Sequence, residues 1–223
     1  MNIMEYLDKN FPTVKLVSSL YYQWNIGIHF SLGEGIYPFE ENSKLNFKHF
    51  KKVYEQTLAI FNELFDQDDD LILVTNIYLQ KKQQTKRMKV YQQNVRNKKN
   101  LKKLNVKTYP YPFEIDETGE YEMQQFSLQC KVDDIHINGL LKAAINEDFP
   151  SLKPRFGADS VHYPDVFFLN VTKDIIFFVY DDRGCEVIAR TTDRLRPLYE
   201  KYSDWVDEFD RERIEKGLGL RLI

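Results

Sequence analysis

Cysteine is scarce in this 223-residue sequence, and its hydrophobic runs are short. Cys130 and Cys185 lie far apart and outside any CxxC pattern, which argues against a disulfide scaffold and favours two buried free thiols in a reducing compartment. No apolar run approaches the roughly 18–20 residues of a membrane span. The N-terminal residues, MNIMEYLDKNFP, lack the basic and apolar regions of a signal peptide. We therefore expect a soluble cytoplasmic protein that does not enter a membrane.

Acidic residues are missing from the window between Leu71 and Phe113. This window carries eleven positive charges, so with a net charge of −3 for the whole chain the remaining residues carry −14. Such segregation can attract a partner of opposite charge, or the window can pair with the acidic residues of 114–122. Nucleic acid is a possible partner but is disfavoured by a pI near 5.9. The basic residues are Lys81, Lys82, Lys86, Arg87, Lys89, Arg96, Lys98, Lys99, Lys102, Lys103 and Lys107.

Hydrophobic periodicity predicts an α+β protein with a mainly antiparallel sheet and three or more covering helices. We expect a single domain, 1–223, in which residues 80–107 form one or two short helices and can form a mobile lobe or insertion. The predicted strands are 24–32, 71–79, 125–132, 165–171, 175–180 and 185–189, and the last three form a C-terminal meander. The predicted helices are 4–10, 47–65 capped by Asn46, 134–149 capped by Asp133 or Asp134, and 203–216 capped by Ser203.

The most informative motif is the turn Asp181-Asp182-Arg183-Gly184 between the last two predicted strands. The favoured interpretation is structural: the two acids accept local backbone hydrogen bonds, and Gly184 takes the positive φ of a tight hairpin. The alternative is functional. Asp181 and Asp182 would then bind a divalent ion, or Arg183 would bind a carboxylate or phosphate, together with one of the histidines.

Other residues that commonly carry chemistry occur without a diagnostic pattern. The four histidines, at positions 29, 49, 136 and 162, show no zinc-ligand spacing. Gly33-Glu34-Gly35 lacks the further residues of a phosphate-binding loop and is interpreted as a strand-ending loop. Cys185 is interpreted as a structural thiol. The sequence therefore predicts no catalytic residue, no metal ligand and no cofactor.

The C-terminal region combines an aromatic residue with many acids. Trp205 is flanked by Asp204, Asp207 and Glu208, with Asp210 and Glu212 beyond them. An amphipathic helix with a core tryptophan explains this composition. An anionic surface for a basic protein partner, centred on Trp205, Asp207 and Glu208, is the alternative.

Several segments resemble a known bacterial family. They are YDDRGCEVIAR at 180–190, DVFFLNVTKDIIF at 165–177, LLKAAINEDFP at 140–150, YEKYSDWVDEFDRERI at 199–214 and YYQWNIGIHFSLG at 21–33. Together they are similar to family 3885 of the domains of unknown function, marked by the motif YDDRG and found chiefly in Bacillus and its relatives. This resemblance implies a small uncharacterised cytoplasmic bacterial protein and no particular activity.

The sequence as a whole favours a non-catalytic module that binds another protein, with an immunity- or antitoxin-like inhibitor as one such module. The first alternative is a metal- or phosphate-dependent enzyme, or a nucleotide-binding protein, that uses Asp181, Asp182 and Arg183. The second is nucleic-acid binding through the basic segment 81–107, which predicts strong salt dependence.

Overall fold

The computed structural model describes residues 3–81, 89–113, 119–156 and 163–220. A seven-stranded antiparallel sheet runs through the molecule, in the order β1-β7-β6-β5-β2-β4-β3. This confirms the predicted α+β class and the C-terminal meander. The strands are β1 (Gly27–Ser31), β2 (Asp70–Gln80), β3 (Asn105–Pro110), β4 (Tyr121–Lys131), β5 (Asp165–Asn170), β6 (Ile175–Val179) and β7 (Gly184–Ala189).

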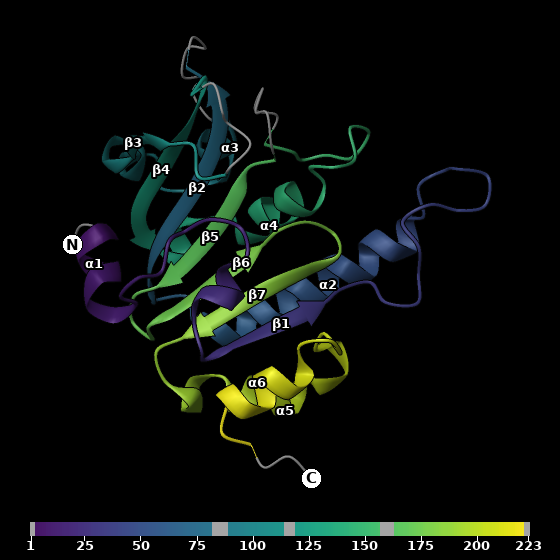
Figure 1. The fold of residues 1–223 in the computed structure, drawn as a ribbon. Coiled ribbons are helices and arrows are strands. Elements are labelled where there is room, and N and C mark those ends of the chain that lie inside the picture. The colour runs from purple at the N-terminus through teal and green to yellow at the C-terminus, as the bar shows by residue number, and fades with distance from the viewer. Residues whose placement is uncertain (1–2, 82–88, 114–118, 157–162, 221–223) are drawn as a thin grey trace.

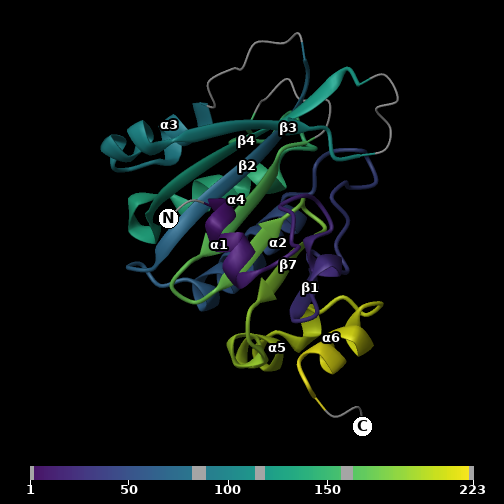
Figure 2. The same ribbon diagram turned by 60° about the vertical axis from the view of Figure 1, so that its left-hand side comes forward.

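Helices cover both faces of the sheet, so its central strands are buried on both sides. In β5, Val166 and Phe168 pack on one face, whereas Phe167 and Leu169 pack on the other. Figure 2 shows α1 (Ile3–Asn10) in front of the sheet, with α2 (Phe47–Leu64) and α4 (Ile137–Ile145) behind it. Alternate side chains of a strand point to opposite faces, which explains why β6 and the central residues of β5, Val166 to Leu169, are all apolar.

Helix α2 is the longest helix and positions one side of the site described below. The side chain of Asn46 accepts a hydrogen bond from the backbone N–H of Lys48 (3.2 Å), as the predicted cap requires. The apolar residues recur every three or four positions and face the sheet, where Phe61 packs edge-on against Phe168 (5.4 Å between ring centres). His49 lies in the first turn, on the same buried face.

The C-terminal end of the basic segment forms a strand of the sheet. Residues 89–110 form α3 (Lys89–Asn94), the 3-10 helix η2 (Lys98–Lys103) and β3, which pairs with β4. Arg96 forms an ion pair with Asp133 (2.9 Å), and the ammonium group of Lys98 donates to the carbonyl of Val95 (2.7 Å). Hydrophobic periodicity did not predict β3, because β3 is a half-exposed edge strand with Lys107 near its centre. Lys82, Lys86 and Arg87, and most of the acidic residues of 114–122, lie outside the described residues.

The C-terminal region departs most from prediction. The single helix expected at 203–216 is wrong: the chain forms α5 (Arg196–Lys201), a short 3-10 turn (Ser203–Trp205) and α6 (Arg211–Gly217). Between them Val206 makes an antiparallel bridge with Phe30 of β1, and the N–H of Asp207 donates to the carbonyl of His29 (2.9 Å). Pairing with the exposed edge of β1 holds this stretch extended, which prevents a continuous helix. In Figure 1, α5 and α6 lie beside β1.

The helix expected at 134–149 also has a different start and end. Asp133 and Asp134 belong to a 3-10 turn (Val132–Asp134), and α4 begins only at Ile137, after His136. The side chain of Asp134 accepts a hydrogen bond from the backbone N–H of Lys131 (3.1 Å), so it caps the turn instead of the helix. Helix α4 ends at Ile145, which leaves Glu147, Asp148 and Phe149 in the loop that follows.

Candidate functional site

The segment Tyr180–Gly184 connects β6 to β7 and meets the end of β1. Gly184 does not take a positive φ, so that detail of the prediction is wrong. Gly184 is required for space: a Cβ atom there would overlap the hydroxyl of Tyr180 and lie 2.5 Å from the backbone oxygen of Phe30. The hydroxyl of Tyr180 in turn lies 2.9 Å from Nε2 of His29. The tyrosine and the glycine of YDDRG thus form one packing unit.

Asp181 and Arg183 bind each other within the turn. The carboxylate of Asp181 accepts from the backbone N–H of Arg183 (2.7 Å) and from its Nε (2.9 Å), and the terminal guanidinium nitrogen also contacts it. These hydrogen bonds, together with the negative charge of Asp181, raise the pKa of Arg183. The backbone hydrogen bond to Asp181 is of the local kind predicted for this turn. In addition, the charges of Asp181 and Arg183 offset each other.

Asp182 points the opposite way and meets a histidine that is 133 residues distant in sequence. Its Oδ2 lies 2.7 Å from Nε2 of His49, and Nδ1 of His49 lies 2.7 Å from the carbonyl oxygen of Ile36. Both side chains are almost fully buried, at 5% and 6% exposure for His49 and Asp182. Gly33 makes room for this imidazole, since a Cβ atom there would lie 2.7 Å from its Nδ1.

The hydrogen-bond partners fix the charge of this buried pair. The carbonyl of Ile36 only accepts, so Nδ1 of His49 carries a proton. The short contact between Nε2 of His49 and Oδ2 of Asp182 contains one further proton. Whether this proton is bound to the imidazole or to the carboxylate, the net charge of the pair is zero. Burial raises the pKa of Asp182, whereas the hydrogen bond from His49 lowers it; burial is the larger effect.

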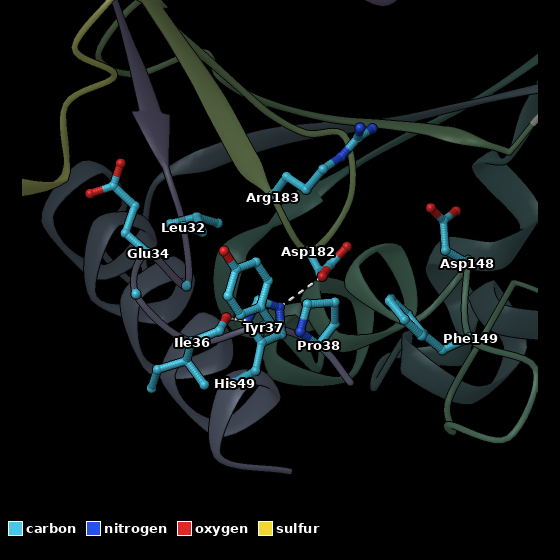
Figure 3. Close-up of a pocket in the computed structure, with 12 residues that line it drawn as sticks. Leu32, Glu34, Ile36, Tyr37, Pro38, His49, Asp148, Phe149, Asp182 and Arg183 are labelled. Carbon is cyan, nitrogen blue, oxygen red and sulfur yellow. Dashed lines mark hydrogen bonds and ion pairs between the residues drawn. The ribbon is translucent and has the colours of Figure 1, made fainter. Parts of the chain in front are cut away.

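A cavity of about 490 Å³ opens beside the His49–Asp182 pair. Figure 3 shows His49 and Asp182 on one side and Asp148 with Phe149 on the other. Its apolar walls come from Leu32, Ile36, Tyr37, Pro38 and Phe149, and Arg183 and Glu34 also line it. We call this cavity the acidic pocket. It brings together four parts of the chain: the loop after β1, the start of α2, the loop after α4 and the turn between β6 and β7.

Asp148 is the pocket carboxylate with an unsatisfied oxygen. Its Oδ1 is buried and has no hydrogen-bond partner among the described residues. Burial raises the pKa of Asp148, the negative charges of Asp181 and Asp182 raise it further, and the positive charge of Arg183 opposes part of this rise. Since Asp181 is paired with Arg183 and Asp182 with His49, the net negative charge of the pocket comes from Asp148 and the exposed Glu34. The pocket therefore favours a cationic ligand.

Asp148→Asn is expected to stabilise the protein at pH 7. A carboxyl group whose pKa is raised by folding contributes stability below its unfolded pKa, near 3.9, and that contribution is lost as pH rises through its folded pKa. Because solvent screens part of the repulsion, we expect a gain of up to about 1 kcal/mol at pH 7 and none at about pH 3.5. Urea unfolding at both pH values measures this, with the exposed Asp204→Asn as the control. A loss of stability at pH 7 would show that Asp148 has a stabilising role instead.

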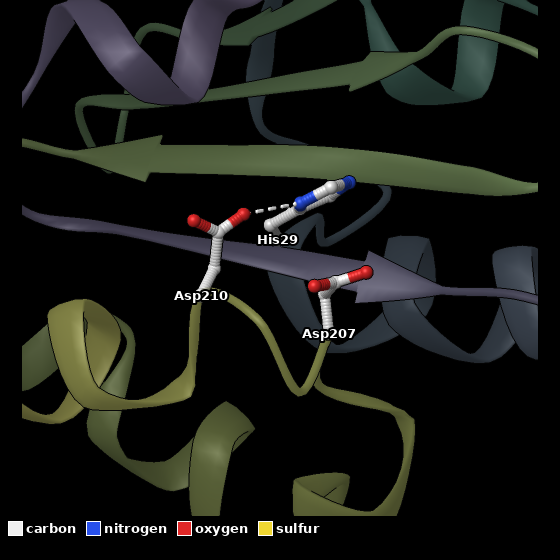
Figure 4. A group of neighbouring side chains, drawn as sticks. All are labelled: His29, Asp207 and Asp210. Atoms are coloured by element: carbon white, nitrogen blue, oxygen red, sulfur yellow. Dashed lines mark hydrogen bonds and ion pairs between the residues drawn. The ribbon is translucent and has the colours of Figure 1, made fainter.

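A second polar cluster lies on the other side of the Tyr180–Gly184 segment. His29, Asp207 and Asp210 place one nitrogen and two carboxylate oxygens within 4.8 Å of one another (Figure 4). His29 comes from β1, and the two aspartates follow the stretch that pairs with its edge. Asp207 was predicted as a binding residue on other grounds, whereas His29 and Asp210 were missed. His29 and Asp210 are 181 residues apart in sequence, so no local spacing indicated that they lie together.

The remaining predicted site residues lie apart from the acidic pocket. Trp205 is half-buried and stacks on Tyr202 (4.5 Å between ring centres), and Glu208 is exposed and pairs with Arg211 (2.6 Å). Cys130 and Cys185 are both free; Cys185 is fully buried, and burial raises its pKa well above the usual value. His136 precedes α4, and His162 lies outside the described residues.

Comparison with known proteins places the chain in a family. The model of a domain of unknown function, DUF3885, matches residues 3–210, nearly the whole chain. The chain belongs to this family. It is also 58% identical over 211 residues to the uncharacterized protein YnaE of Bacillus subtilis strain 168, covering 94% of this chain and 99% of YnaE. No solved structure matches significantly. Within the described residues of this DUF3885 protein, every helix is too short or too polar to cross a membrane.

Proposed function

We propose that this DUF3885 protein is a non-catalytic binding module that takes a basic side chain of a protein partner into the acidic pocket. The observation that carries the proposal is the buried, unpartnered oxygen of Asp148, next to two acids whose charges are already offset. A lysine or arginine head group would compensate Asp148 and supply the missing hydrogen bond. The apolar pocket walls suit its aliphatic stem.

The state of His49 favours binding over catalysis. A general base needs a ring nitrogen that can take a proton from the substrate. Both ring nitrogens of His49 are engaged, one by the carbonyl of Ile36 and the other by Asp182. Asp181, Asp182 and Arg183 are likewise engaged with neighbours, which weakens the alternative in which they hold a metal or phosphate together.

Exposed aromatic side chains around the pocket support a macromolecular partner. Tyr37 lines the pocket and is 83% exposed, and Phe39 is 51% exposed. Phe39 packs beside Phe149, on the pocket wall (5.8 Å between ring centres). Large aromatic groups at a surface commonly anchor protein interfaces. An inhibitor of a basic protein, acting in the cytoplasm, fits this surface and the two free thiols.

Affinity capture tests this function. Tagged protein is incubated with lysate of its source organism at low and moderate salt, and wild type is compared with Asp148→Asn. We expect a stoichiometric protein partner that is retained by wild type and by the exposed control Glu208→Gln but lost with Asp148→Asn. A partner retained equally by all three proteins would contradict the role of the pocket. Retention of nucleic acid alone would move the function to the basic segment.

A further inference from the structure

The cluster of His29, Asp207 and Asp210 is built from two segments fixed against each other. Nδ1 of His29 lies 2.7 Å from Oδ2 of Asp210, and the ligand atoms of all three residues lie within 4.8 Å of one another. The backbone hydrogen bond from Asp207 to His29 and the bridge between Val206 and Phe30 hold the aspartates over β1. In Figure 4, both carboxylates approach the same imidazole.

Neighbouring hydroxyl groups orient each of the three side chains. The hydroxyl of Ser31 donates to Oδ2 of Asp207 (2.7 Å), and the hydroxyl of Tyr22 donates to Oδ2 of Asp210 (2.9 Å). Nε2 of His29 lies 2.9 Å from the hydroxyl of Tyr180. Partners of this kind, which hold the second nitrogen of a histidine and the carboxylates beside it, surround metal ligands in proteins.

A separate observation at the cluster is the hydroxyl of Tyr21. Tyr21 is only 1% exposed, and its hydroxyl has no hydrogen-bond partner in the part of the chain that the structure describes. Its ring lies beside that of His29, at 5.9 Å between ring centres. A buried hydroxyl without a partner is costly, and a water bound to a nearby cation would satisfy it.

We propose that His29, Asp207 and Asp210 bind a divalent first-row transition-metal ion such as Zn²⁺ or Mn²⁺. One imidazole nitrogen and two carboxylate oxygens form a donor set that suits these ions, with water completing the coordination. The site is distinct from the acidic pocket and does not depend on its function.

Binding requires only a local adjustment of the ligands. Donor atoms that share an ion at about 2.1 Å are separated by about 3.0–3.4 Å, slightly more than the present distance between His29 and Asp210. The proton between these two groups must leave, because the nitrogen that binds the metal is deprotonated. The other ring nitrogen then donates its proton to Tyr180, which fixes the orientation of the imidazole.

Calorimetric titration of the full chain with Zn²⁺ and with Mn²⁺ tests the site. We expect one saturable site per chain for at least one of these ions, and at least about a tenfold loss of affinity in Asp207→Asn. Glu208→Gln, an exposed acid on the same stretch, is the matched control and should bind as wild type does. Cys130→Ser, which removes the half-buried thiol, should also leave affinity unchanged.

A second measurement on the wild-type protein avoids any dependence on the folding of the variants. The ¹⁵N resonance of Nδ1 in His29 should shift as Zn²⁺ is added, in proportion to the saturation seen by calorimetry. No saturable binding of either ion below about 1 mM would overturn the proposal, as would full affinity in Asp207→Asn or, where calorimetry shows that Zn²⁺ binds, an unchanged His29 resonance. Any of these results would leave the cluster as a hydrogen-bond network that attaches the C-terminal region to β1.

Discussion

His49→Ala is expected to lower the free energy of unfolding by about 3–5 kcal/mol at pH 7, because it leaves the buried carboxyl of Asp182 without its partner. The cost should shrink as pH falls. Without His49, burial raises the pKa of Asp182 with nothing to oppose it, so the folded variant gains a proton more readily than the unfolded chain and is stabilised toward pH 4. Urea unfolding of wild type and variant at pH 4.5, 6 and 7.5 measures this.

Asp182→Asn is the matched control for the His49→Ala experiment. An asparagine amide can donate to Nε2 of the neutral imidazole, so the pair remains satisfied and the expected cost is only about 1 kcal/mol. The double variant should be less destabilised than the sum of the single variants. An equal effect of His49→Ala at pH 4.5 and 7.5 would contradict the charge assigned to the pair.

Gly184→Ala is expected to destabilise the protein by about 3 kcal/mol, at the upper end of the range for overpacking. The added methyl group would overlap the hydroxyl of Tyr180 and press against the backbone oxygen of Phe30, which has no rotamer by which to move away. Displacement of Tyr180 would also break its contact with His29. Thermal or urea unfolding, with near-ultraviolet circular dichroism to follow the tyrosine environment, measures both effects.

Gly35→Ala provides the comparison for Gly184→Ala. Gly35 has a φ of +77° but has open space around the position of a Cβ atom, so alanine there costs only the backbone strain of about 1–2 kcal/mol. If Gly184→Ala were no more destabilising than Gly35→Ala, the packing role assigned to the glycine of YDDRG would be wrong.

Local sequence patterns predicted the parts of the fold that depend on local interactions. Helix α2 follows from its apolar spacing and from Asn46, and strands β5 to β7 follow from short, mainly apolar segments separated by turns. The edge strand β3 and the extended stretch around Val206 were missed, because each is held by pairing with a distant strand. Local hydrophobic patterns do not show which distant strand a segment pairs with.

The candidate site was predicted only in part for the same reason. The turn at Asp181–Gly184 stood out as a motif, and the backbone hydrogen bond to Asp181 is of the local kind predicted, whereas the side-chain pairing of Asp181 with Arg183 was not predicted. No sequence pattern predicted His49 or Asp148 as site residues. His49 lies in the first turn of the predicted helix 47–65, and Asp148 lies at the end of the predicted helix 134–149. Only the sheet order, which places β1 beside β7, brings the loop after β1 against this turn and closes the pocket.

The proposed binding mode is tested most directly by NMR titration of ¹⁵N-labelled protein with N-acetyl-argininamide, a single guanidinium side chain, and with the uncharged N-acetyl-glutaminamide. We expect saturable shifts at Asp148, Asp182 and His49 with a Kd of about 1–10 mM for the arginine compound only. The affinity should fall at least about fivefold in Asp148→Asn and stay unchanged in Glu208→Gln. Equal responses to both compounds, or an unchanged Kd in Asp148→Asn, would contradict recognition of a cationic group by the acidic pocket.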